Sequence, residues 1–161
     1  MSKLRRLRDV PDNPGELDEP DDEFWITNDY SPRHGIDGGV YRLDGETTEF
    51  RVGYSEYNEW REALALYTLG VTPEEIWTDP EAFLGEPFVR LINFSDCDGV
   101  IGGRPARTLA RESDENRAAI AERARNATDV DPDHAVWFME IYDDFARAFA
   151  LAAEDGCVSF Q

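Results

Sequence analysis

The strongest structural signal of the chain lies in residues 131–156, DPDHAVWFMEIYDDFARAFALAAEDG. Aspartate followed by proline is typical of a helix start, because the aspartate side chain accepts from free N–H groups and proline has no N–H to satisfy. The apolar residues that follow recur at helical spacing, so one face of the helix is expected to pack on a core. These residues are Ala135, Phe138, Tyr142, Phe145, Phe149 and Ala152. The predicted helix ends at Gly156.

Two further long helices are predicted upstream. The first covers residues 56–69, begins after the cap residue Ser55 and ends before Gly70. Its core-facing residues are Tyr57, Trp60, Leu64 and Tyr67. The second covers residues 105–126 and carries little apolar surface. Between them, residues 72–75 read Thr-Pro-Glu-Glu, a capping box that predicts a short helix.

Strands are predicted nearer the N-terminus. Residues 24–28 are rich in aromatic and β-branched side chains, as strands are. Residues 40–43 and 47–52 flank Asp44-Gly45, and Asp-Gly between two such runs favours a β-hairpin, because a type I′ turn requires positive φ angles. A short final strand is expected within residues 158–160.

The remaining segments carry weaker signals. The apolar run 88–94 fits either a buried strand or a helix, because its length does not separate them. Residues 95–103 are expected to form a loop. Residues 9–23 combine many carboxylates with three prolines, so we expect an acidic, proline-rich loop with some mobility.

These elements predict one domain over residues 1–161 of the α+β class. The chain length is typical of a single domain, and 41% hydrophobic residues suffice for a buried core. We expect a small N-terminal antiparallel sheet packed with three main helices, of which the two longest are C-terminal.

The formal net charge of −19 limits the function classes. Such a field repels nucleic-acid phosphates and anionic lipids and attracts proteins with a basic surface. No apolar run approaches the roughly 20 residues of a membrane-spanning helix, and no secretory signal is recognisable, so a cytoplasmic location is expected. The acidity fits either a binding face or adaptation for solubility in salt. The few cysteines and histidines predict no metal site and no cofactor.

The best candidate for chemistry is the segment Phe-Ser-Asp-Cys-Asp-Gly-Val at 94–100. An apolar run followed by Asp-x-Asp-x-Val resembles the nucleophile motif of haloacid-dehalogenase-type phosphatases, which would make Asp96 the nucleophile and Asp98 the acid/base beside Mg²⁺. Two long helices follow here rather than alternating strands and helices, and no lysine follows Lys3. The favoured interpretation is that both aspartates cap a turn and the next helix.

A second candidate segment is GYSEYNEWR at 53–61, where aromatic residues stand beside asparagine and arginine. Such residues line ligand pockets and interfaces, although the helical spacing of Tyr57 and Trp60 favours core packing. The two segments could also form two walls of one small-ligand pocket. Together they supply the ligand or interface candidates Tyr54, Asn58, Arg61, Asn93, Ser95, Asp96 and Asp98.

The chain also resembles a family of small, uncharacterised bacterial and phage proteins. The resemblance is carried by GYSxYNxWR at 53–61, LINFSDCDGVIG at 91–102, FARAF at 145–149 and DGCVSF at 155–160. It implies no activity and therefore assigns no functional residue. The chain departs from the family pattern at Gly103, where a proline usually follows Ile-Gly, and in its acidic N-terminal stretch.

The predicted function is a non-enzymatic interaction protein of bacterial or phage origin, of the immunity or anti-defence inhibitor type. Its acidic surface would bind a protein with a basic surface, without membrane or nucleic acid. Two alternatives stay open: a Mg²⁺-dependent phosphatase-like enzyme using Asp96 and Asp98, and a small-ligand-binding protein. The sequence leaves the oligomeric state open.

Overall fold

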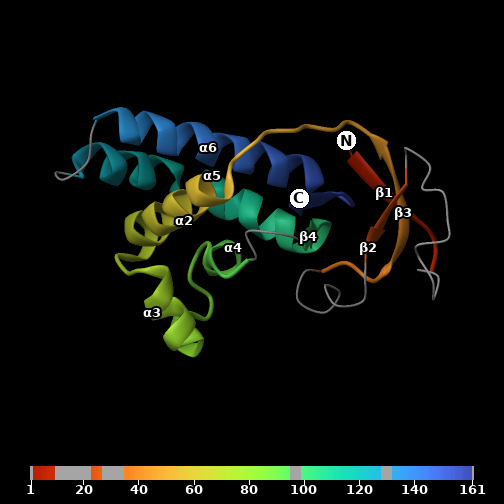
Figure 1. The fold of residues 1–161 in the computed structure, drawn as a ribbon, viewed down its shortest axis with the longest axis horizontal. Coiled ribbons are helices and arrows are strands. Elements are labelled where there is room, and N and C mark those ends of the chain that lie inside the picture. The colour runs from red at the N-terminus through yellow and green to blue at the C-terminus, as the bar shows by residue number, and fades with distance from the viewer. Residues whose placement is uncertain (1, 10–22, 27–34, 95–98, 128–131, 161) are drawn as a thin grey trace. The chain divides into compact units, whose positions relative to one another are not determined.

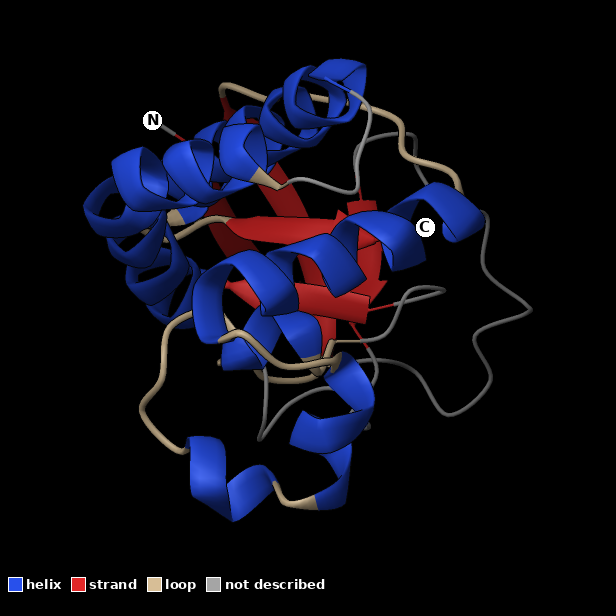
Figure 2. Ribbon diagram, turned by 90° about the vertical axis from the view of Figure 1, so that its left-hand side faces the viewer, coloured by secondary structure: helices blue, strands red, loops and turns tan. Residues whose placement is uncertain are grey.

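The computed structural model describes residues 2–9, 23–26, 35–94, 99–127 and 132–160 (Figure 1). Its helices are α2 (Tyr54–Leu69), α3 (Pro73–Thr78), the 3₁₀ turn η3 (Pro80–Phe83), α4 (Val89–Ile92), α5 (Gly103–Asn126) and α6 (Pro132–Ala152). Its strands are β1 (Ser2–Arg8), β2 (Glu23–Ile26), β3 (Gly39–Gly45), β4 (Gly99–Gly102) and β5 (Cys157–Phe160). Helices and strands both contribute, as Figure 2 shows, so the predicted α+β class is confirmed, with α5 and α6 the longest helices.

The chain divides into two compact units, each assembled from stretches that are distant in sequence. The sheet unit comprises Met1–Thr48, Asp98–Thr108 and Ala148–Gln161. The helical unit comprises Glu49–Cys97 and Leu109–Arg147. Helices α5 and α6 each contribute residues to both units, so neither unit is a continuous piece of chain. That residues 1–161 form one domain stays a prediction.

The sheet unit contains two small antiparallel sheets. The first has the strand order β1-β3-β2, and its register places Leu4 opposite Leu43 and Trp25 opposite Val40. The second pairs β4 with β5, with Val100 opposite Ser159. The apolar cluster of this unit consists of Ile26, Ile36, Tyr41 and Val100, with Cys157 packed against it. Cys157 is a free thiol, and burial raises its pKa to about 11.

Antiparallel pairing near the N-terminus is confirmed, but the predicted turn is not where the chain reverses. Asp44 and Gly45 end β3, and Gly45 pairs with Ser2 rather than with a following strand. Residues 46–53 have no helix or strand, so the predicted strand at 47–52 is wrong. Gly45 has a φ of 110°, which favours glycine at the strand end. Strand β3 pairs instead with β1 and β2, and the arginine-rich sequence of β1 gives no strand signal.

The apolar run at 88–94, whose type the sequence left open, contains the helical turn α4. Phe88 precedes it in the left-handed conformation (φ 62°), and its N–H donates to Glu112 Oε2 at 2.9 Å. Burial raises the pKa of Glu112 above its ordinary value. A non-glycine residue seldom adopts positive φ, so the α5 carboxylate helps to hold this conformation.

The loop predicted over 95–103 is wrong for its second half, because residues 99–102 form β4. Glycine stands at both ends of this strand, and glycine has a low strand propensity, so the sequence does not predict a strand here. The final strand is confirmed within β5. Residues 95–98 lie outside the described residues. Of the loop predicted over 9–23, the structure describes only Asp9, which follows β1, and Glu23, which begins β2.

The helical unit is built on the apolar faces predicted for α2 and α6. Every residue of both predicted sets is buried, although Phe149 and Ala152 lie in the part of α6 that belongs to the sheet unit. Trp60 lies at the centre, with its ring centroid 4.7 Å from that of Phe145 and 5.9 Å from that of Phe138. Tyr142 donates through its hydroxyl to the Ser113 carbonyl at 2.7 Å, which links α6 to α5.

The helix ends follow the capping rules with one correction. Thr72 accepts from the Glu75 N–H at 3.4 Å, and Glu75 Oε2 accepts from the Thr72 N–H at 2.8 Å, which confirms the predicted capping box. Gly70 is left-handed at the end of α2, as predicted. The cap of α2 is Gly53 rather than Ser55, because the Glu56 carboxylate accepts from the Gly53 N–H at 3.2 Å.

Candidate functional site

Arg61, on α2, is held by groups from several segments of the helical unit. Its guanidinium carbon lies 5.4 Å from the ring centroid of Tyr57 and 5.1 Å from that of Trp77. Nη1 donates to the Phe94 carbonyl at 3.1 Å, and Nη2 donates to Asn58 Oδ1. Nε is buried without a hydrogen-bond partner among the described residues. The side chain therefore joins α2, α3 and the end of α4.

These contacts bring the two candidate segments of the sequence together. Besides the Arg61 contact with Phe94, the Tyr57 hydroxyl donates to the Leu91 carbonyl at 3.3 Å. Arg61 and Asn58 bond to each other, which gives both a role in holding the fold. Ligand binding between the segments stays a prediction.

The remaining candidate residues divide into two groups. Tyr54 is 57% exposed at the first residue of α2, and Asn93 is exposed directly after α4. Ser95, Asp96 and Asp98 lie outside the described residues. Their proposed roles, in a capped turn or in phosphoryl transfer, therefore stay predictions.

Replacing Arg61 with lysine is expected to lower the free energy of unfolding by about 1–2 kcal/mol, because hydrogen bonds from a charged donor contribute about that much. A lysine ammonium lacks the planar fork that bonds Phe94 and Asn58 while lying against two rings. Urea denaturation measures the loss. Arg125→Lys is the matched control, since Arg125 is exposed on α5 and should change stability by less than about 0.5 kcal/mol. Equal losses in the two variants would contradict the role given to Arg61.

The second feature is a projection formed by residues 73–86, which we call the acidic projection. It contains α3 and η3, and lies beside α2 in the helical unit (Figure 1). Ile76 is fully buried and anchors it, while the capping box at Thr72 fixes its start. Its exposed carboxylates are Glu74, Glu75, Asp79, Glu81 and Glu86.

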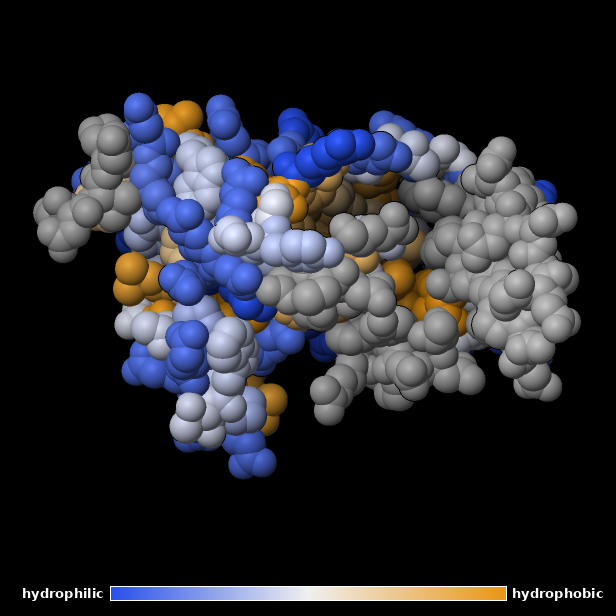
Figure 3. Space-filling view, viewed as in Figure 1, coloured by the Kyte–Doolittle hydropathy of each residue, from blue (hydrophilic) through white to orange (hydrophobic). Residues whose placement is uncertain are grey.

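Two large apolar side chains are exposed among these carboxylates. Trp77 is 46% exposed and Leu84 is 78% exposed. Figure 3 shows mostly hydrophilic residues over this part of the molecule, with apolar surface interspersed. No basic residue occurs between Arg61 and Arg90, so every charged side chain within the acidic projection itself is a carboxylate.

Sequence reasoning missed the acidic projection as a candidate. The sequence at 72–75 predicts the helix, but a helix of six residues shows too few turns to define an exposed face, so no pattern marks Trp77 as exposed. The absence of basic residues between 61 and 90 was the available signal.

The described residues contain no group of three or more histidine, cysteine or carboxylate side chains placed to hold a metal ion. Among the helices of the described ranges, none is long and apolar enough to cross a membrane. No protein-family model, curated protein or solved structure matches the chain. The resemblance to small bacterial and phage proteins therefore stays a prediction, and any function rests on the geometry of this chain alone.

Proposed function

We propose that this chain is a non-enzymatic binding protein whose acidic projection docks on a protein with a basic surface. The observation that carries the proposal is the exposure of Trp77 and Leu84 within a stretch of carboxylates that contains no basic residue. Tryptophan is among the residues most often dominant at protein interfaces. Surrounding carboxylates favour a cationic partner and speed its association.

The contact between Trp77 and Arg61 favours an interface role for Trp77. The Arg61 guanidinium lies against the indole ring, and hydrogen bonds to Phe94 and Asn58 hold the guanidinium in place. An aromatic side chain that is already oriented loses less conformational entropy on binding. Trp77 therefore presents an oriented apolar side chain to the partner. The exposed carboxylates of Glu74 and Glu81 are available to basic residues of the partner around that contact.

A defined cationic probe tests the proposal. The probe is a 16-residue amphipathic helical peptide of arginine and leucine, titrated into the isotopically labelled chain and followed by NMR. We expect the double variant Glu74→Lys/Glu81→Lys to weaken binding by about tenfold or more, since like charges at an interface are unfavourable. Binding to the original chain should also weaken as salt rises.

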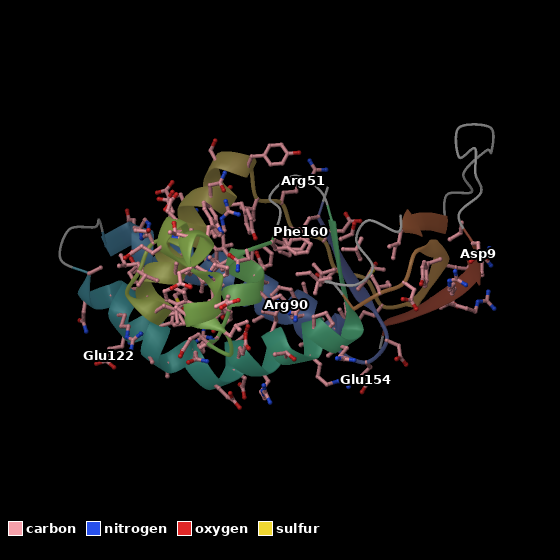
Figure 4. The ribbon with its side chains drawn as sticks, turned by 90° about the horizontal axis from the view of Figure 1, so that it is seen from below. Asp9, Arg51, Arg90, Glu122, Glu154 and Phe160 are labelled. Atoms are coloured by element: carbon pink, nitrogen blue, oxygen red, sulfur yellow. The ribbon has the colours of Figure 1, made fainter. Side chains whose placement is uncertain are left out.

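Two matched controls separate docking from general attraction to an acidic protein. Glu122→Lys reverses an exposed charge on α5 (Figure 4), and should weaken binding far less than the double reversal in the acidic projection. Leu66→Ser removes another exposed apolar residue, 56% exposed on α2, and should matter less than Leu84→Ser. Equal effects inside and outside the acidic projection would refute the docking site. Mg²⁺-dependent hydrolysis of a phosphate ester that is lost in Asp96→Asn would refute the non-enzymatic assignment.

A further inference from the structure

The sheet unit contains an open hollow of about 800 Å³ that is independent of the acidic projection. The hollow is lined from β1 and β3, from the start of α5 and from the turn that follows α6. β1 lies at the edge of its sheet, so the hollow borders a strand that is paired on one side only in the described sheet. We call it the arginine hollow, because Arg5, Arg6, Arg104 and Arg107 all line it.

The guanidinium groups differ in how their charges are balanced. Arg5 forms an exposed ion pair with Asp44, whose carboxylate oxygen lies 3.7 Å from its Nε. Arg107 Nη2 donates to the Ala153 carbonyl at 2.7 Å, which is a neutral acceptor. Arg104 forms no hydrogen bond or ion pair with the described residues. The charges of Arg104 and Arg107 are therefore not cancelled by any carboxylate within ion-pair distance among those residues.

Arg6 adds a third guanidinium that is already oriented. Its Nε and Nη2 donate to the Gly38 carbonyl at 3.3 and 2.9 Å. Nη2 also contacts the Asp9 carboxylate, whose side chain is 88% exposed. An ion pair that is exposed to this extent is weak and exchanges readily with solvent. An incoming anion can therefore compete with Asp9 while the carbonyl keeps the arginine in place.

The backbone beneath Arg104 and Arg107 is tightly packed. A Cβ atom on Gly103 would lie 3.0 Å from the Ala152 carbonyl oxygen and 3.3 Å from the Asp155 Cα, so the start of α5 is in close contact with the end of α6. The Ala153 carbonyl that orients Arg107 belongs to the same turn. Two of the three guanidinium groups are thus carried by a rigid helix start, which limits the entropy lost when they bind a ligand.

We infer that the arginine hollow binds a small anion that carries phosphoryl groups. Guanidinium groups match phosphate oxygens in pairs and remain charged at every physiological pH. A volume of about 800 Å³ lies within the range of small-molecule sites. Asp37, Glu154 and Asp155 also line the hollow, and Figure 4 shows Glu154 on the turn after α6. These carboxylates, together with Asp44, repel anions, whereas Arg104 and Arg107 have no carboxylate partner among the described residues. The phosphoryl groups are therefore assigned to Arg104 and Arg107, with Arg6 as the third guanidinium.

Calorimetric titration with inorganic pyrophosphate tests the inference. Arg104→Gln is the informative variant, because Arg104 has no partner in the described structure whose loss would disturb the fold. It is expected to weaken binding by about tenfold, the loss of one charged hydrogen-bonding group. Arg111→Gln is the matched control: Arg111 is exposed two turns along α5, lies outside the hollow and faces Glu115 at 4.0 Å. The control is expected to bind as the original chain does.

Two further arms identify the ligand class. ADP that binds more tightly than pyrophosphate would assign the hollow to nucleotides, whereas equal affinities would assign it to the phosphoryl groups alone. Sodium sulfate at matched ionic strength reveals non-specific salt effects. A rise in melting temperature with pyrophosphate should accompany binding and disappear in Arg104→Gln. The inference is overturned if pyrophosphate and ADP show no saturable binding up to about 10 mM, or if Arg104→Gln and Arg111→Gln bind equally.

Discussion

Replacing Trp60 with alanine is expected to lower the free energy of unfolding by about 3–5 kcal/mol, the usual cost of removing a large aromatic side chain from a core. Trp60 is 1% exposed and packs with three aromatic rings, those of Tyr57, Phe138 and Phe145. Its Nε1–H also donates to the Phe138 carbonyl at 3.2 Å. The variant therefore loses apolar contacts and leaves a cavity between α2 and α6.

Two further variants separate these contributions in the same denaturation experiment. Trp60→Phe keeps an aromatic ring but lacks the N–H that donates to the Phe138 carbonyl. Its free energy of unfolding should therefore lie between that of the original chain and that of Trp60→Ala. Leu66→Ala, at an exposed position of the same helix, should change stability by less than about 0.5 kcal/mol. If Trp60→Ala were no more costly than Leu66→Ala, the core assigned to the helical unit would be wrong.

The elements with a repeating local pattern were predictable from sequence. In α6 the six residues predicted to face the core recur over five turns, and every one of these six is buried in the structure. The Thr72 capping box and the Gly70 helix end also follow from contacts within a few residues. Such signals require no knowledge of the rest of the chain, which explains why they were reliable.

The strands were less predictable, because their pairing joins residues that are far apart in sequence. β1 contains four arginines and lysines among its seven residues and forms a strand through its register with β3. β4 reads Gly-Val-Ile-Gly and is completed by β5, more than fifty residues later. Local propensity carries little information about such pairings.

The candidate sites divide in the same way. The segment around Arg61 was recognised from its composition, and the structure shows that Arg61 holds α2, α3 and α4 together. The sequence pattern does not predict the arginine hollow. Its lining comes from β1, α5 and the turn after α6, and only the folded sheet unit brings these segments around one space.

Alanine at Gly102 is expected to destabilise the sheet unit by at least about 3 kcal/mol, at the upper end of what overpacking costs. A Cβ atom there would lie 2.6 Å from the Gly35 carbonyl oxygen, 2.9 Å from the Gly35 carbonyl carbon and 3.0 Å from the Ile36 Cβ. The nearest neighbours are backbone atoms, which cannot turn aside as a flexible side chain can. Gly35 is itself in the left-handed conformation (φ 73°) and pressed against Pro105, which limits its movement further.

Gly53→Ala is the control for the glycine substitution itself. Gly53 has extended backbone angles, and a Cβ atom there would meet nothing within 4 Å. Its replacement should change stability by less than about 0.5 kcal/mol, because reduced freedom of the unfolded chain offsets a slightly poorer cap. Hydrogen exchange locates the effect: in Gly102→Ala, the amides of β4 and β5 should lose protection before those of α2. Unchanged protection in β4 would show that Gly102 is not in close contact with Gly35.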